Sequence, residues 1–261
     1  MEDILHTIVE HKKAELAERM ARVPLREMIV RAEAVRRPTV SMSRSLLRSP
    51  SGIIAEFKRR SPSKGWIARE ARPEETVPAY ERNGAAALSI LTDEAFFGGS
   101  VRDIETVRPL VTLPVLRKDF VVDAYQIYEA RAVGADAVLL IAAVLSGEQC
   151  RRLTRTAHGL GLEVLLEIHC EEELGHVTAE TDMVGVNNRH LGTFRTDVRH
   201  SFALAGRLPS DRPLVSESGL SRPESLRELR AAGFGGFLIG ETFMKTPDPG
   251  AALRDLIEAS L

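Results

Sequence analysis

The sequence predicts an α/β protein, and within that class a (β/α)₈ barrel of the TIM type. Short apolar segments alternate with amphipathic segments from residue 53 onward. The apolar segments are hydrophobic on both faces, as in residues 138–141 (VLLI), which is typical of parallel strands buried on both sides. Eight such segments are present, each followed by a predicted helix or helical connection. A doubly wound open sheet is the alternative, weakened by the count of eight and by the lack of a GxGxxG loop after any strand.

The predicted strands are short and aliphatic, and the segments between them have helical periodicity. In chain order the strands are expected at residues 53–57, 86–91, 114–117, 137–142, 162–167, 183–186, 213–216 and 236–239. The clearest helices are expected at residues 74–83, 123–133, 146–158 and 222–232. Each of these helices is followed directly by a glycine, the usual residue at a helix C-terminus, at Gly84, Gly134, Gly159 and Gly233.

Helix starts support the same boundaries. Ser146 is a predicted N-cap with Gln149 as its capping-box partner, and Pro223 falls in the first turn of the helix that follows Ser221. The connections at residues 170–178 and 196–206 have the weakest helical patterns. Helices are still expected there, because parallel neighbours need a crossover connection.

Residues 1–52 lie outside the alternating pattern. Ile4, Ile8, Leu16 and Met20 recur near helical spacing, and a second helix is expected around residues 25–32. Residues 36–51 are rich in Arg, Ser and Pro and are typical of a linker or loop. We therefore expect a single (β/α)₈ barrel domain over residues 1–261, with an N-terminal helical extension and linker at 1–52 and the barrel proper at 53–261.

Composition narrows the classes of function. The 261 residues are 44% hydrophobic and 28% charged, which suits a globular protein with a large core. The net charge of −2 gives no basic excess for nucleic acid, and no apolar run is long enough to span a membrane. The N-terminus lacks the pattern of a signal peptide, and the two cysteines form no CxxC pair. We expect a cytoplasmic protein without a disulfide framework or zinc site.

Polar side chains follow most of the predicted strands. In a barrel of this type, the carboxyl ends of the strands form the active-site mouth. The polar residues at those ends are Glu56, Lys58, Thr92, Asp93, Lys118, Asp119, Glu167, Asn187, Arg189, Glu217, Ser218 and Glu241. One such residue would be an ordinary loop charge, but convergence of many on one mouth favours an acid–base site.

The two lysines at this mouth have two possible chemistries. Repulsion between Lys58 and Lys118, together with burial, would favour a neutral amine that forms an imine with a carbonyl substrate. The carboxylates of Glu56, Glu167 and Glu217 oppose this by holding both lysines charged. A charged ammonium group suits protonation of a carbonyl or binding of a carboxylate, so a general acid is favoured over an imine former.

Two glycine-containing segments are placed to bind a phosphate. Residues 216–219 (SESG) follow the seventh predicted strand and residues 238–242 (LIGET) follow the eighth, where this fold often binds phosphate. Ser61 and Lys64 would close over the same group. Trp66 and the Phe96–Phe97 pair would either line an aromatic-binding wall or cover the barrel top, and the sequence does not separate these two roles.

These motifs carry a resemblance to a known family. The chain resembles the indole-3-glycerol-phosphate synthase family over most of its length. The most specific segments are residues 56–65 (EFKRRSPSKG), 91–94 (LTDE), 114–120 (PVLRKDF), 185–189 (GVNNR), 216–219 (SESG) and 238–241 (LIGE). The resemblance implies closure of 1-(2-carboxyphenylamino)-1-deoxyribulose 5-phosphate to an indole ring, with loss of CO₂ and water. It implies no metal and no organic cofactor.

The resemblance also implies roles for individual residues. Lys118 would protonate the ketose carbonyl, and Glu167 would transfer protons during dehydration. Lys58 would hold the substrate carboxylate and take part in proton transfer. Glu56 and Glu217 would orient the lysines and bind substrate hydroxyl or amine groups.

The remaining implied roles concern the sugar phosphate. Asn187 and Arg189 would hold the hydroxyl-bearing chain and the carboxylate network. The phosphate would be bound by Ser61, Ser218, Gly219, Gly240 and the backbone N–H of Glu241. Local departures from the family pattern are Gly192, Arg195 and Ala124, none of them at an implied catalytic position.

Two other classes of function are alternatives. One is another barrel enzyme acting on a phosphosugar, either phosphoribosylanthranilate isomerase or a Schiff-base aldolase. The isomerase would need a Cys and an Asp at strand ends, and neither Cys150 nor Cys170 is well placed for that role. The other is a non-catalytic barrel, which would be expected to lose some of the converging charges. The expected partner is a small phosphorylated substrate, and the expected state is a monomer or weak homo-oligomer.

Overall fold

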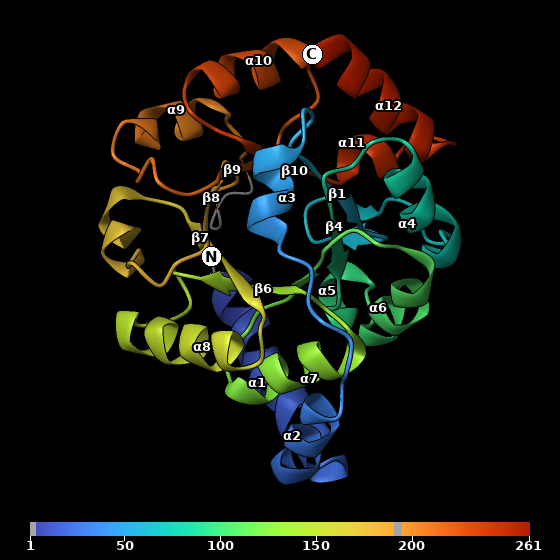
Figure 1. Cartoon of the computed structure of the whole chain (residues 1–261), viewed down its shortest axis with the longest axis vertical. Coiled ribbons are helices and arrows are strands. Elements are labelled where there is room, and N and C mark those ends of the chain that lie inside the picture. The colour runs from blue at the N-terminus through green and yellow to red at the C-terminus, as the bar shows by residue number, and fades with distance from the viewer. Residues whose placement is uncertain (1–3, 191–194) are drawn as a thin grey trace.

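Eight parallel strands form a closed barrel in the computed structural model, which describes residues 4–190 and 195–261 (Figure 1). The strands are β1 (Ile53–Phe57), β4 (Ala87–Leu91), β5 (Val115–Lys118), β6 (Ala137–Ile141), β7 (Glu163–Ile168), β8 (Met183–Asn187), β9 (Leu214–Glu217) and β10 (Gly236–Ile239). Each strand pairs with the next in this order, and β10 pairs with β1 to close the ring. The predicted fold class is confirmed, and the predicted strands match the observed ones to within one or two residues.

Helices surround the barrel. The longer ones are α4 (Pro73–Arg82), α6 (Val101–Val107), α7 (Ala124–Val133), α8 (Gly147–Gly159), α9 (Arg199–Ala205), α10 (Pro223–Ala231) and α12 (Pro249–Ser260). Shorter elements are α5 (Glu94–Phe97), α11 (Glu241–Met244), and the 3-10 helices η1 (Arg108–Leu110) and η2 (Glu171–His176). A small hairpin, β2 (Arg60–Ser61) and β3 (Gly65–Trp66), follows β1. The weak helical pattern at 170–178 thus folds as a 3-10 helix.

Helix caps agree with the sequence in part. Ser146 and Gln149 form the predicted capping box of α8. The predicted C-terminal glycine of that helix is wrong, because Gly159 lies inside α8 and Gly161 is the residue with a positive φ, +74°. The helix extends one residue further than predicted, because the backbone N–H of Leu160 still donates to the carbonyl oxygen of Ala157.

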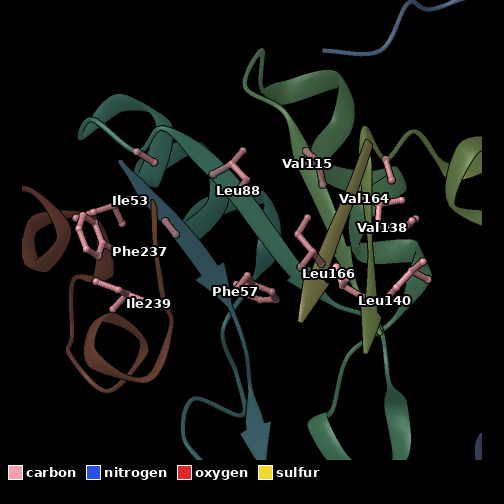
Figure 2. Close-up of a cluster of buried hydrophobic side chains, with 14 of the residues drawn as sticks. Ile53, Phe57, Leu88, Val115, Val138, Leu140, Val164, Leu166, Phe237 and Ile239 are labelled. Atoms are coloured by element: carbon pink, nitrogen blue, oxygen red, sulfur yellow. The ribbon is translucent and has the colours of Figure 1, made fainter. Parts of the chain in front are cut away.

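Side-chain alternation divides the strands into two cores. Ile53, Phe57 and Ile239 point outward toward the helices, as Figure 2 shows, and belong to the larger core. Ile54, Leu116 and the other strand residues of a second, smaller core point into the barrel and fill its interior. Because strand side chains alternate between faces, each strand buries both faces and reads as a continuous apolar run.

The N-terminal residues form α1 (Ile4–Arg22), α2 (Leu25–Glu33) and α3 (Met42–Arg48). The expectation that residues 36–51 are only a linker is wrong, since α3 lies within them. Ser41 caps this helix, and Met42 and Leu46, one turn apart, are buried in the barrel interior. Figure 1 shows α3 crossing the end of the barrel that faces the viewer. The helix therefore closes the amino ends of the strands.

Two carboxylates, one of them buried, hold this closed end together. Asp136 accepts hydrogen bonds from the backbone N–H groups of Val40 and Val115 and forms ion pairs with Arg37 and Arg108. The carboxylate of Glu163, the first residue of β7, accepts hydrogen bonds from two hydroxyls of α3: that of Ser41, its N-cap, and that of Ser43 in its first turn.

Among the described residues, no helix is long and apolar enough to cross a membrane.

Candidate active site

One pocket at the carboxyl ends of the strands brings the predicted site residues together. Its lining includes Glu56, Lys58, Ser61, Lys118, Glu167, Asn187, Arg189, Glu217, Ser218, Gly219, Gly240 and Glu241. Strand parity explains the convergence. Ile54 and Leu116 point into the barrel, so the residues two and four positions further along β1, and two further along β5, point inward as well. These are Glu56, Lys58 and Lys118.

Opposite charges are paired across the pocket. The Lys58 Nζ lies 2.7 Å from Oε1 of Glu56, so the pair predicted from the sequence forms and faces the pocket. The Lys118 Nζ lies 3.1 Å from Oε2 of Glu167 and 3.6 Å from Oε2 of Glu217. Burial alone would lower the pKa of Lys118, but Glu167, Glu217 and Glu56 raise it above its usual value. The Lys118 amine is therefore held as an ammonium ion.

Glu167 is surrounded by hydrogen-bond donors and cations. Besides Lys118, its carboxylate accepts from Nδ2 of Asn187 at 3.0 Å and lies 3.1 Å from Nε2 of His169. Burial would raise the pKa of Glu167, but Lys118, His169 and Asn187 outweigh it and lower the pKa well below the usual range. Glu167 is therefore ionised and able to accept a proton.

His169 is a site residue that sequence motifs do not single out. Burial would lower its pKa, but the nearby carboxylates of Glu167 and Glu173, 3.1 and 3.7 Å from the ring nitrogens, raise the pKa to about 9. The ring is therefore an imidazolium at neutral pH and adds a positive charge beside Glu167. The sequence signal that could have identified His169 is its position two residues after Glu167, because side chains two apart on an extended chain share a face.

Glu217 has the opposite electrostatics. It is buried, and its Oε1 has no hydrogen-bond partner among the described residues. Burial and the negative charge of Glu167 raise the pKa of Glu217 to about 8. Two carboxylates sharing one cation in this way tend to keep one proton between them. Glu217 is thus the protonated carboxyl group of the cluster.

Two inward-facing glycines make room for these acids. A Cβ at Gly185 on β8 would lie 2.2 Å from Oε1 of Glu217. A Cβ at Gly240, directly after β10, would lie 2.4 Å from Oε1 of Glu56. Any larger side chain at these positions would overlap a site carboxylate, so both glycines are needed for the arrangement of the acids.

The segment after β9 has an unusual backbone geometry. Ser218 is the one non-glycine residue with a positive φ (69°) in the described part of the chain, and Gly219 follows with φ 76°. Strained backbone of this kind concentrates at ligand sites. The hydroxyl of Ser61 is buried and has no hydrogen-bond partner among the described residues. Arg189 joins the two sides: it donates to Ser63 and lies 3.7 Å from the Glu241 carboxylate.

Apolar residues form the other side of the pocket. They come from two loops and from the N-terminal helix, and are Ile4, Leu5, Ile8, Pro62, Phe97 and Phe120. Of the aromatic residues considered from the sequence, only Phe97 lines the pocket. Trp66 is half exposed and stacks against Arg60 and Arg69. The contribution of α1 carries no sequence motif, since its apolar spacing indicates only an amphipathic helix.

Two further sequence expectations concern residues outside this lining. Lys64, expected near the phosphate, and Thr92 do not line the pocket. The hydroxyl of Thr92 donates to Asp119 instead. The departure noted at Gly192 lies outside the described residues. Within residues 4–190 and 195–261, no group of three His, Cys, Asp or Glu side chains is arranged to hold a metal ion.

Comparison with known proteins decides the family. The family model described as indole-3-glycerol phosphate synthase matches residues 5–256, nearly the whole chain. The chain belongs to this family. A curated indole-3-glycerol phosphate synthase from Bacteroides thetaiotaomicron is 60% identical, over 99% of both chains. Another, from Azoarcus sp. strain BH72, is 45% identical over 98% of this chain and 99% of the relative.

Solved structures of distant proteins share the fold. A tryptophan synthase α-subunit from Legionella pneumophila is 15% identical and covers 84% of this chain and 97% of its own, with a TM-score of 0.62. A 3-hexulose-6-phosphate synthase is 12% identical and covers 80% of this chain and 100% of its own, with a TM-score of 0.64. At these identities the likeness supports the barrel alone, whereas the synthase family rests on the matches over the whole chain.

Proposed function

We propose that this chain is an indole-3-glycerol phosphate synthase. It closes 1-(2-carboxyphenylamino)-1-deoxyribulose 5-phosphate to indole-3-glycerol phosphate and releases CO₂ and water. The observation that carries the proposal is the Lys118 ammonium, held charged chiefly by ionised Glu167 and placed between an apolar wall and the polar loops after β9 and β10. A substrate with an aromatic acid at one end and a phosphate at the other fits that division.

Binding would use the two ends of the pocket separately. The phosphate lies at the loops after β9 and β10, where Ser218, Gly219, Gly240 and the Glu241 backbone face the pocket. The buried, unpartnered hydroxyl of Ser61 supplies a further donor. Hydroxyl and backbone donors are suited to phosphate oxygens, and the Ser61 hydroxyl has no internal hydrogen bond to break first.

The aromatic end would lie between α1 and the loops after β4 and β5. Ile8, Phe97 and Phe120 give this end apolar surface. Lys58 stands beside it and pairs with the substrate carboxylate in exchange for part of its bond to Glu56, 2.7 Å away. Arg189 and Asn187 would hold the hydroxyl-bearing chain between the two ends.

Ring closure joins the carboxylate-bearing ring carbon to the ketose carbonyl carbon. The carbonyl π electrons move to oxygen, which takes a proton from the Lys118 ammonium and becomes a hydroxyl. The carboxylate leaves as CO₂, and its bonding electrons restore the aromatic ring. An ammonium group beside the carbonyl stabilises the developing oxyanion, which is where general acid catalysis has its effect.

Dehydration then completes the indole. The new hydroxyl leaves as water after taking a proton from an acid, and a proton leaves the adjacent carbon that bears the nitrogen. Ionised Glu167 serves as the proton-transfer carboxylate, while Lys58 and protonated Glu217 are the remaining proton donors. Glu56 orients Lys58, with which it is paired.

The electrostatics also weigh against a Schiff-base aldolase. Imine formation needs a neutral amine, and the carboxylates around Lys118 raise its pKa above the usual value instead of lowering it. Borohydride in the presence of a ketose phosphate should therefore leave the protein mass unchanged. A stable substrate adduct on Lys118 would favour the aldolase.

The decisive test is an indole assay. Purified protein is mixed with the aminoketose phosphate, and indole absorbance and fluorescence are followed. The expected result is a rise that depends on enzyme concentration, with release of CO₂ in equal amount. A matched sample carrying Glu167→Gln, which keeps the shape but not the charge, should be strongly impaired. No indole from the wild-type protein would sink the proposal.

We further propose a cytoplasmic location and a monomeric or weakly associating state. The two cysteines, Cys150 and Cys170, are free thiols, which suits a reducing compartment. Light scattering on the purified protein at micromolar concentration tests the second part, because a tight oligomer would persist on dilution.

A further inference from the structure

Helix α1 carries one lysine into the protein interior. Lys12 is 2% exposed, and its Nζ lies 2.9 Å from Oδ2 of Asp93 and 3.0 Å from Oδ1 of Asp119. Glu15, on the same helix, is 2.9 Å away. Asp93 and Asp119 follow β4 and β5, so this one ammonium group ties the N-terminal helix to two loops at the barrel mouth.

The aspartates are themselves fixed from the barrel side. Oδ2 of Asp119 accepts from the hydroxyl of Thr92 at 2.7 Å and lies 3.1 Å from Nη2 of buried Arg117. Asp93 caps α5 by accepting from the backbone N–H of Phe96. Burial alone would lower the pKa of Lys12, but Asp119, Asp93 and Glu15 raise it above its usual value, so the lysine stays charged. The contact is therefore a fixed point with little freedom.

The same face of α1 forms the apolar wall of the pocket. Residues four and seven apart share a helix face, so Leu5 and Ile8 lie on the same side as Lys12. Both line the pocket, as does Ile4. Lys12 is thus the charged anchor one turn beyond the wall. Its partner Asp119 is also the residue next to Lys118, whose ammonium lies against Glu167.

We propose that Lys12 is a positioning residue for the synthase reaction, fixing α1 over the mouth so that Ile4, Leu5 and Ile8 form the binding wall for the aromatic end of the substrate. The inference rests on the proposed function. Lys12 itself does not line the pocket, so it acts through the residues it anchors. Loss of the anchor would weaken binding of the aromatic end and leave the phosphate end unchanged.

A matched pair of variants tests this. Lys12→Met removes the anchor at the mouth, and Arg37→Met removes a more exposed cation from buried Asp136 at the amino end. Arg117 stays paired with Asp119 and Arg108 with Asp136, whereas the ion pair between Lys12 and Asp93 is lost. We expect Lys12→Met to raise KM for the aminoketose phosphate by about tenfold or more, with a smaller change in kcat. Arg37→Met should lower the melting temperature but leave KM unchanged.

Inorganic phosphate separates the two ends of the pocket. As a competitive inhibitor, inorganic phosphate should have the same inhibition constant for Lys12→Met and for the wild type, because the residues proposed to bind it lie in the loops after β9 and β10. An unchanged KM, or an inhibition constant that weakens as much as KM, would overturn the positioning role. An inactive wild-type protein would instead refute the proposed function.

A double variant covers the case in which Lys12→Met folds poorly. Adding Asp93→Asn removes one unpaired buried charge and keeps an N-cap oxygen for α5, so the melting temperature should recover. KM should stay raised, because no charged contact then ties this part of α1 to the loops after β4 and β5. Recovery of KM together with stability would show that Lys12 matters only for folding and would contradict the inference.

Discussion

The two ends of this barrel contain the same kind of group, a buried carboxylate, in opposite states. At the amino end, the Asp136 carboxylate accepts from two backbone N–H groups and two arginines. At the mouth, Glu56, Glu167 and Glu217 crowd around two lysines, and one oxygen of Glu217 has no hydrogen-bond partner among the described residues. Each end is also covered by a helix of the N-terminal extension, the amino end by α3 and the mouth by α1.

The difference teaches which buried charges hold the fold and which carry the chemistry. Donors that match every acceptor compensate for desolvation and keep the site rigid, as at Asp136. Acids of like charge that share too few donors destabilise the protein but acquire shifted pKa values in both directions, as at Glu167 and Glu217. Incomplete pairing at the mouth leaves donors and protons available to a substrate.

The largest effect should follow from removing the ammonium group at the mouth. Lys118→Met should lower kcat by about 10²–10⁴-fold, the usual contribution of a general acid, while substrate binding stays measurable by fluorescence titration. Lys245→Met, at an exposed lysine, is the control and should behave as wild type. A wild-type rate for Lys118→Met would remove Lys118 from the mechanism.

The next test adds one methyl group at the mouth. Gly185→Ala would place a Cβ 2.2 Å from Oε1 of Glu217 and displace that carboxyl group. We expect a loss of activity of about 10²-fold, as is typical for a misplacement on the order of 1 Å. The matched control is Gly235→Ala, where a Cβ meets nothing within 4 Å, and steady-state kinetics should show no change. Equal activity in both variants would refute the tight fit.

At the amino end, the expected effect is on stability alone. Asp136→Asn leaves Arg37 and Arg108 without a counter-ion and should lower the free energy of unfolding by about 3–5 kcal/mol. KM and kcat measured well below the melting temperature should not change. Asp211→Asn removes an exposed carboxylate from its pair with Arg212 and should leave the free energy of unfolding nearly unchanged. A large change in kcat for Asp136→Asn would contradict the division between the two ends.

The last comparison concerns pH. The raised pKa of Glu217, about 8 against 4.5 for an ordinary glutamate, means that the folded protein binds a proton that the unfolded chain has released. Stability should therefore fall as pH rises from about 4.5 to about 8, with a slope near one proton. Glu217→Gln should flatten that slope in denaturation experiments across the window. An identical slope would show that Glu217 is ionised in the folded state.

Much of the barrel and of its inner site follows from the sequence because strand periodicity is strict. Once residues 53–57 are placed as a buried strand, alternation puts Glu56 and Lys58 on one face. The same alternation predicts that Lys118 and Glu167 point toward the barrel mouth from their own strands. Helix α3 was not predicted because seven residues are too few to form a stable helix alone, and the helix depends on packing against the barrel end.

The Lys12 contacts could not be predicted for a different reason. An amphipathic pattern identifies which face of α1 is buried but not what it is buried against. Lys12 stands among apolar residues on that face, where a lysine normally snorkels to solvent. Its partners, Asp93 and Asp119, are expected at strand ends, but nothing in the sequence pairs either of them with a residue of α1. Contacts between residues so far apart depend on the whole tertiary structure.

The docking of α1 has a consequence for the order of folding. Arg19 of this helix contacts Glu129, 110 residues later in the chain, so α1 gains its tertiary partners only after strands β4 and β5 and helix α7 exist. Closure of so long a loop is slow compared with helix formation. Helix α1 therefore reaches its native place only after these later elements have formed. A chain interrupted before residue 129 would lack the wall of its own binding pocket, so affinity for the substrate would report completed folding.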